Sequence, residues 1–267
     1  MIHHVKKLMG FLVQKPVVPV QQPIEATIPR VPTPGPSIAF INQSTILTDA
    51  QVYHAMTKLQ IQVDRDFAPL WKTDANLYFY PKSVTPPANF WVFYILDDTD
   101  QAGALGYHDL TDAGMPIAKI FAKTDQENKL SWTVTMSHEL LEMLADPYIQ
   151  NCVFDQDSNT TGNLYALEVC DAVEDDSFGY MVGDVLVSDF VLPAWFEGFR
   201  SANSTKFDFK NIVHAPFALA TGGYIGVFGV DSSTTSGWIQ KTADTVPSKR
   251  MVVKGEYSRF NRRCNHK

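Results

Sequence analysis

The residues with the clearest chemical potential lie in one short segment, Ser137-His138-Glu139-Leu140-Leu141-Glu142. On a helix, His138 and Glu142 are four residues apart, so their side chains lie on one face and within reach of a single ion. Glu139 is rotated by about 100° from His138 and can lie beside that ion without ligating it. In the HExxH helix of zinc hydrolases, two histidines bind the metal and the glutamate activates a water. Here Glu142 replaces the second histidine, and a carboxylate is also an ordinary zinc ligand.

The surroundings of these three residues bear on whether they are simply solvated. An HExxE pattern arises by chance in acid-rich helices, where both acids face water. The stretch from Met136 to Ala145 is otherwise apolar, however, and ionisable side chains on a buried helix are normally paired or bound to metal. Met136, Leu140, Met143 and Leu144 line the opposite side of the helix and are expected to pack against a sheet.

A third ligand is expected from the acidic segment that begins 26 residues after Glu142, Glu168-Val169-Cys170-Asp171. Glu168 and Asp171 both alternate with apolar residues, and a carboxylate from either completes a three-ligand site with an open position for water. The sequence does not choose between them. One histidine and two carboxylates cancel more of the metal's charge than two histidines and one carboxylate. Zinc is the expected metal, but this charge balance weakens the metal's Lewis acidity and shifts the preference towards harder ions such as manganese or calcium.

His108 is a second candidate catalytic residue. It follows the segment Asp97–Gly106, whose three acids and two glycines predict a loop, and we place His108 in that loop. From there, its imidazole can orient a substrate or stabilise an oxyanion. The simpler interpretation is a loop histidine that is hydrogen-bonded to its neighbours.

The elements that position these residues follow from hydrophobic periodicity. Helices are predicted from Thr48, whose capping box with Gln51 marks a start, to Pro69, and over residues 131–145 before Pro147. A turn is predicted at residues 125–129. Strands are predicted in the first half at residues 38–41, 76–80, 90–96 and 117–122, the last as the sheet edge on which a peptide would pair. Shorter strands are predicted at residues 180–182, 185–187, 224–230 and 251–253. The predicted fold class is α+β, with a mixed sheet packed on the active-site helix and an irregular β-rich C-terminal half.

The two ends of the chain differ from its body. Seven prolines between Pro16 and Pro36 exclude a regular helix, so residues 1–36 are predicted to be an arm or a linker, and a protein partner is expected for an arm. Residues 249–267 carry seven basic residues and one acidic residue, which leaves 15 basic against 28 acidic residues in the rest of the chain. Such an acidic body disfavours nucleic-acid binding. The domain between the two ends is predicted to span residues 37–248.

Several protein classes are disfavoured by composition. No apolar stretch approaches the roughly 18 residues of a membrane-spanning helix. The apolar run Leu8–Val13 is too short for a signal peptide, so we expect a soluble protein, cytoplasmic or associated with a virion. Cys152, Cys170 and Cys264 show no CxxC spacing, so neither a disulfide scaffold nor a cysteine-rich zinc module is expected.

Longer segments carry a resemblance to a known group. SHELLEMLADP, EVCDAVEDDSFGY and VSDFVLPAWF are similar to uncharacterised bacterial and phage proteins classed as zincin-like metallopeptidases. The similarity extends from about residue 45 to residue 240 and includes RDFAPLW, DQAGALGYHD and PFALATGGYI. More distantly, the HExxE helix followed by E-x-x-D looks like the plant phosphate-induced, Exordium-type proteins.

The resemblance implies a zincin-like fold in which His138, Glu142 and an acid of the Glu168/Asp171 pair ligate the metal. It also implies that Glu139 is the general base. The leading hypothesis is therefore a metal-dependent hydrolase, most plausibly a peptidase acting on a peptide or protein substrate. The alternative is a non-catalytic structural or interaction protein, such as a phage virion component, that keeps a zincin-like fold with a metal for stability.

Overall fold

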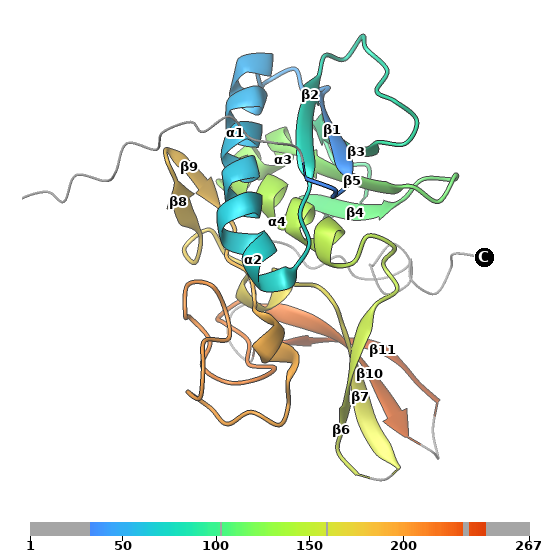
Figure 1. The fold of residues 1–267 in the computed structure, drawn as a ribbon, viewed down its shortest axis with the longest axis vertical. Helices are drawn as coiled ribbons and strands as arrows, with labels where there is room; N and C mark the ends of the chain where they lie inside the picture. Colours follow the sequence, from blue (N-terminus) through green and yellow to red (C-terminus); the bar gives the residue numbers. More distant parts are fainter. Residues whose placement is uncertain (1–32, 102, 159, 232–234, 244–267) are drawn as a thin grey trace, which may run out of the picture. The chain divides into compact units, whose positions relative to one another are not determined.

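Figure 1 shows a computed structural model of the 267-residue chain, which describes residues 33–101, 103–158, 160–231 and 235–243. Most of the predicted arm, the basic tail and the strand predicted at residues 251–253 lie outside the described residues. The predicted contact of the arm with a protein partner also falls outside the described residues. Among the described residues, every helix is too short or too polar to cross a membrane.

Five strands form the first sheet, in the order β2-β1-β3-β5-β4. They are β1 (Ser37–Asn42), β2 (Asn76–Tyr80), β3 (Trp91–Leu96), β4 (Gly106–Leu110) and β5 (Pro116–Phe121). Neighbouring strands from β2 to β5 run parallel, and β4 runs antiparallel to β5. The mixed sheet is as predicted, but β5 is not its edge. The edge strands are β2 and β4, because the hairpin after β4 places β5 between β3 and β4.

The register of the strands places one row of side chains on a single face. Phe40 pairs with Phe93, Phe93 with Ala118, and Ala118 with His108. Because directly paired residues point to the same side of a sheet, His108 lies on the face of the stacked Phe40 and Phe93 rings, whose centroids are 4.6 Å apart. The buried side chains of this face share one hydrophobic core with α1 (Asp49–Ile61) and α4 (Trp132–Ala145).

The first helical segment begins as predicted, with a complete capping box between Thr48 and Gln51. It does not end at Pro69. After α1 the chain continues through a π-helix, η1 (Gln62–Phe67), and a last turn, α2 (Ala68–Trp71). Pro69 lies at the start of α2, where its missing N–H and fixed φ are tolerated. The segment ends at Lys72, whose backbone is left-handed with φ 60°.

Helix α4 has the predicted bounds, with Ser131 as its N-cap residue. Its N-terminus is held by Asp176, whose carboxylate accepts a hydrogen bond from the Ser131 N–H at 2.7 Å. A negative charge at this end also suits the helix dipole. The turn predicted at residues 125–129 is confirmed only at residues 128–129, because the short helix α3 (Ala122–Glu127) occupies the first part of that range. Helix α3 is fastened to α4 because the buried carboxylate of Asp125 accepts a hydrogen bond from the Thr135 hydroxyl at 2.8 Å.

The C-terminal half is β-rich, as predicted. A second, antiparallel sheet has the order β11-β10-β7-β6, and β8 and β9 form a separate hairpin. These strands are β6 (Cys152–Gln156), β7 (Thr161–Ala166), β8 (Tyr180–Val182), β9 (Val185–Val187), β10 (Tyr224–Asp231) and β11 (Thr235–Thr242). The predictions match β8, β9 and β10 to within a residue and miss β6, β7 and β11.

Two buried aspartates anchor the long loop between β9 and β10. Asp189 accepts hydrogen bonds from the backbone N–H groups of Phe190 and Lys210 at 2.8 and 3.1 Å. Asp208 accepts them from Ile212 and Val213, each at 2.8 Å. Burial, together with the adjacent Asp208 carboxylate, raises the pKa of Asp189 to about 8. Asp189 is therefore protonated at neutral pH and can donate its proton to Asp208.

The raised pKa gives a stability prediction for Asp189→Asn. Between its unfolded pKa, 3.8, and about 8, the folded chain holds one proton more than the unfolded chain, so this group lowers stability as pH rises. The slope is about 1.4 kcal/mol per pH unit. An asparagine amide keeps the donor without titrating. We expect the wild type to lose roughly 3 kcal/mol relative to Asp189→Asn between about pH 5 and pH 7.5. Urea unfolding at several pH values measures this difference, and parallel pH profiles would refute the assignment.

Candidate metal centre

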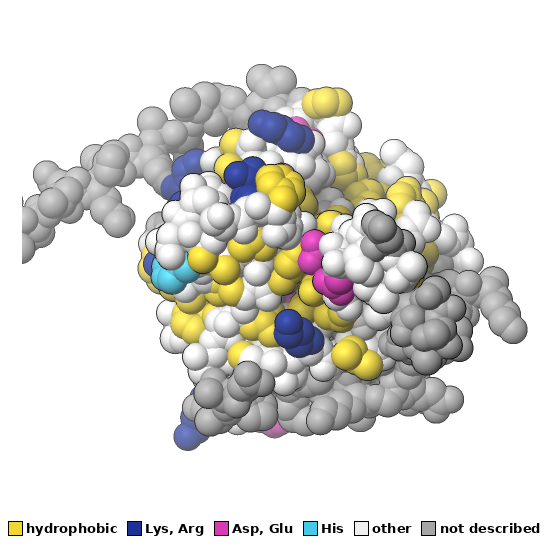
Figure 2. All heavy atoms as spheres, turned by 90° about the horizontal axis from the view of Figure 1, so that it is seen from below, with side chains coloured by type: hydrophobic (Ala, Val, Ile, Leu, Met, Phe, Trp, Pro, Cys, Tyr) yellow, Lys and Arg dark blue, Asp and Glu magenta, His cyan; other side chains and the backbone are white. Residues whose placement is uncertain are grey.

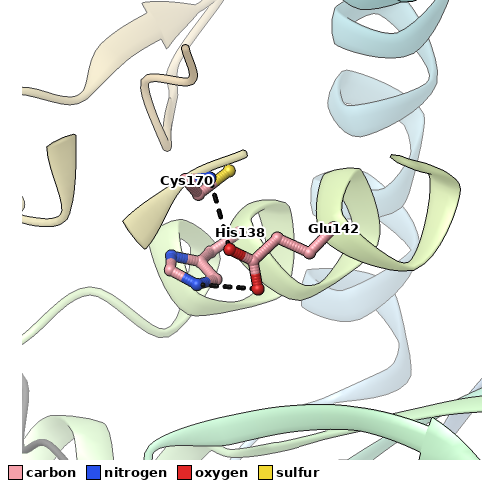
Figure 3. A group of neighbouring side chains, drawn as sticks. All are labelled: His138, Glu142 and Cys170. Atoms are coloured by element: carbon pink, nitrogen blue, oxygen red, sulfur yellow. Dashed lines mark hydrogen bonds and ion pairs between the residues drawn. The ribbon is translucent and has the colours of Figure 1, made fainter. Parts of the chain in front are cut away.

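Helix α4 points His138 and Glu142 to the same side, as their spacing predicts (Figure 3). The His138 Nε2 atom lies 3.2 Å from Glu142 Oε2 and 3.3 Å from Asp171 Oδ1. All three side chains are buried. Ligand atoms bound at about 2.0–2.2 Å in a tetrahedral site lie roughly 3.3–3.6 Å apart. Both separations from His138 Nε2 are close to this spacing, so His138 can share an ion with either carboxylate.

The segment after β7 brings the acids of residues 168–171 to α4. Asp171 begins a 3-10 turn, η2 (Asp171–Val173). The segment is fixed by backbone hydrogen bonds, from Val191 N–H to the Val169 carbonyl at 2.7 Å and from Ala220 N–H to the Ala172 carbonyl at 2.9 Å. The Cys170 N–H donates to Glu142 Oε1 at 3.2 Å, as drawn in Figure 3. One oxygen of Glu142 is thus oriented by the backbone while the other faces His138.

His108 lies on strand β4, so its predicted loop placement is wrong. The loop ends at Leu105, and Gly106–Leu110 pairs with β5. The His108 ring is buried beside α4, with Nδ1 3.5 Å from Glu139 Oε2 and 3.7 Å from Glu142 Oε2. Its Nε2 lies 3.7 Å from Glu168 Oε2. The structure therefore assembles all six residues singled out in the sequence, with Asp171 next to His138 and Glu168 next to His108.

Strand β4 approaches α4 so closely that only glycine fits at its first residue. A Cβ atom on Gly106 would lie 2.9 Å from Glu139 Cγ and 2.9 Å from Thr135 Cγ2. Carbon atoms in contact prefer separations of about 3.5–4.0 Å. Gly106 thus allows the strand to press against Glu139 and to hold His108 over the helix.

A buried polar network fixes the orientation of α4 on its other side. The Ser137 hydroxyl donates to Gln62 Oε1 at 2.7 Å and accepts from the Ser188 N–H at 3.0 Å. Gln62 in turn donates to the Ser188 carbonyl at 3.0 Å. Gln62 is the first residue of the π-helix η1, an element that often marks functional sites. The residue immediately before His138 is therefore tied to both η1 and the end of β9.

The cluster concentrates negative charge in the protein interior. Ten acidic side chains of the described residues are buried, of the 29 acids in the chain. Acids are rarely buried unless they are paired or bound to metal. On the face shown in Figure 2, acidic side chains cover only a small area. Part of the excess of acidic residues outside the basic tail is therefore buried in the protein interior.

The electrostatics of His138 reflect this concentration. Burial alone would lower its pKa, but the Glu142 and Asp171 carboxylates outweigh burial and raise the pKa of His138 well above its ordinary value. The imidazole is held where positive charge is strongly favoured. The same negative charge would stabilise a divalent cation bound at this position.

Cys170 is a possible ligand that the sequence did not indicate. One ligand atom from each of His138, Glu142 and Cys170 lies within 4.8 Å of the others. Burial raises the pKa of the Cys170 thiol well above its ordinary value, and Glu142 adds to this effect. A lone cysteine without a CxxC partner gives no signal in the sequence.

The strand that carries His108, by contrast, has a signal in the sequence. Thr111-Asp112-Ala113-Gly114 is a typical hairpin turn between two short strands.

Comparison with known proteins does not assign the chain to a family. No family model matches it, and neither the curated proteins nor the solved structures contain a match. The function is therefore argued from the geometry of the site.

Proposed function

We propose that the chain is a zincin-like, metal-dependent hydrolase that acts as a peptidase. The observation that carries the proposal is the buried triad in which His138 Nε2 lies 3.2 and 3.3 Å from carboxylate oxygens of Glu142 and Asp171. Zinc is the first choice for these ligands, and manganese or calcium suits the same oxygen-rich set. When bound, the metal would lower the pKa of a water and polarise a peptide carbonyl.

The residues around the triad have distinct proposed roles. Glu139 is the general base, because it follows the ligand His138 on α4 without sharing its position and its Oε2 faces His108 at 3.5 Å. His108 orients the substrate or stabilises the negative charge that develops on its carbonyl oxygen. Cys170 N–H holds Glu142 in place, as outer-shell donors do for metal-binding carboxylates.

The sheet supports a peptide as the substrate class. Strand β4 is one of the two edge strands of the sheet and carries His108, and in the described part of the chain no other strand pairs with its outer side. An extended peptide can add to such an edge through backbone hydrogen bonds. A peptide bound there would run alongside the strand that faces Glu139. The same arrangement, an antiparallel edge strand beside the metal-binding helix, supports the zincin-like interpretation of the fold.

A second candidate is a non-catalytic protein in which the metal only stabilises the fold. The specific observation in its favour is burial: the side chains of His138, Glu139 and Glu142 are 3%, 3% and 0% exposed. A structural site is closed, whereas a catalytic site keeps a position open to substrate.

Metal removal separates the two candidates. Chelation of the purified full-length chain should lower its melting temperature in either case. At metal concentrations about 100 times the dissociation constant, bound metal contributes about 2.7 kcal/mol. For a peptidase, cleavage of a quenched fluorescent peptide library should also stop on chelation and return with added Zn²⁺ or Mn²⁺. A metal-dependent melting temperature without cleavage would support the structural candidate, and a chain indifferent to chelation would refute both.

Gly106→Ala tests whether the close approach of β4 serves the site. The added methyl group collides with Glu139 and Thr135, so the strand or the general base must shift. Overpacking of this kind costs about 1–3 kcal/mol. We expect kcat/KM for the cleaved peptide to fall at least about 10-fold, since a shift of about 1 Å can cost 100-fold. Metal content should not change. Unaltered kcat/KM in a folded variant would show that this contact does not position Glu139.

A further inference from the structure

The carboxylate of Glu142 belongs to two ligand groups rather than one. On one side, Glu142 Oε2 lies 3.2 Å from His138 Nε2, with Asp171 beyond it. On the other side, the same oxygen lies 3.7 Å from His108 Nδ1. The other ring nitrogen, His108 Nε2, lies 3.7 Å from Glu168 Oε2. One ligand atom from each of His108, Glu142 and Glu168 lies within 4.8 Å of the others. Each group contains one histidine, and Glu142 is common to both; on the His138 side, Asp171 and Cys170 are the further ligands within reach.

The cluster contains more acidic groups than one divalent ion can balance when all of them are ionised. Glu139, Glu142, Glu168 and Asp171 are all at most 3% exposed and supply four negative charges when ionised. Both histidines are neutral when they ligate a metal. A single divalent ion leaves two negative charges in the interior, which is strongly unfavourable. Two divalent ions balance the four carboxylates.

The ligand types also suit a pair of ions. Histidine with bridging and terminal carboxylates is the donor set of dimetal carboxylate proteins, in which helices project Glu and His side chains inward. In dimetal hydrolytic sites the ions are about 3.5–4 Å apart and together hold the attacking and leaving oxygens. A shared oxygen between two histidines, 3.2 Å from one and 3.7 Å from the other, is placed as a bridge between such ions.

We infer that the site binds two divalent metal ions bridged by Glu142, one held by His138 and Asp171 and the other by His108 and Glu168. This inference rests on the proposed metal-dependent function and specifies its active centre. It gives His108 and Glu168 the role of ligands in a second site, in place of substrate orientation for His108. Because only oxygen and imidazole ligands are involved, Mn²⁺, Fe²⁺ and Zn²⁺ are the ions this centre would take.

Metal counting tests the inference on the full-length chain. The protein is stripped with chelator and dialysed against Zn²⁺ or Mn²⁺, and bound metal is then measured by elemental analysis. We expect two ions in the wild type and one in His108→Ala and in Glu168→Gln. With Mn²⁺, the wild type should give the electron paramagnetic resonance spectrum of an exchange-coupled pair, and both variants that of an isolated ion. His54→Ala, which removes a half-exposed histidine on α1, should keep two ions.

The outcomes distinguish this inference from the proposed function. One ion in the wild type, with the spectrum of isolated Mn²⁺, would overturn the two-ion centre and leave the mononuclear site intact. Glu168 would then orient His108 through its Nε2 atom. No bound ion would overturn both. Circular dichroism establishes that each variant is folded, and the wild-type count alone decides the question if neither variant folds.

Discussion

Replacing His138 with alanine is expected to abolish high-affinity metal binding to the His138–Asp171 group. His138 supplies the only imidazole of that group, and its Nε2 is the atom that both Glu142 and Asp171 face. Loss of outer-shell partners alone costs 10–100-fold in metal affinity, so loss of this ligand should cost more than about 100-fold. Titration of the stripped chain with Zn²⁺ in the presence of a competing chromophoric chelator measures the change.

The controls for this experiment separate ligand loss from unfolding. His54→Ala removes a histidine paired with the exposed Asp184 and should bind metal like the wild type. His138→Gln retains a hydrogen-bonding side chain among the buried acids and is a gentler replacement than alanine. If folded His138→Ala and His138→Gln both bind metal with wild-type affinity, His138 is not a ligand.

Glu139→Gln is expected to reduce peptide cleavage by a factor of about 100 to 10,000 without changing metal content. The amide has nearly the shape of the carboxylate but cannot take a proton from water. Its contacts with Gly106 and His108 can remain, so the fold should be unaffected. Single-turnover kinetics on the cleaved peptide, with metal analysis of the same sample, measure both quantities.

Glu127→Gln is the matched control, because Glu127 is an exposed residue at the end of α3. It should cleave peptide at the wild-type rate. If Glu139→Gln also retains the wild-type rate while both proteins hold metal, the general base is not Glu139. Loss of metal in Glu139→Gln would instead assign Glu139 to the ligands.

Much of the site was predictable because its signals are local. The i, i+4 spacing of His138 and Glu142 places them on one helix face whatever surrounds the helix, and α4 has the predicted bounds. The capping box at Thr48 is equally local. Glu168 and Asp171, which were chosen as ligand candidates because they alternate with apolar residues, are both buried.

What could not be predicted depends on contacts between distant residues. His108 was assigned to a loop because its neighbours are polar, but pairing with Ala118 makes the segment a strand. The same pairing takes β5 away from the sheet edge. The sequence left Glu168 and Asp171 as alternatives because nothing in it shows that a second histidine arrives beside Glu168. Pro69 was expected to end the helix, yet the π-helix before it makes Pro69 the start of a new turn.

X-ray crystallography with anomalous scattering shows directly whether a metal ion lies between His138, Glu142 and Asp171. Crystals of the zinc-loaded chain, measured on both sides of the zinc absorption edge, locate the ion independently of the refined protein atoms. We expect an anomalous peak about 2.0–2.2 Å from His138 Nε2 and from oxygens of Glu142 and Asp171. Zinc-loaded crystals with no peak within coordination distance of His138 would contradict it.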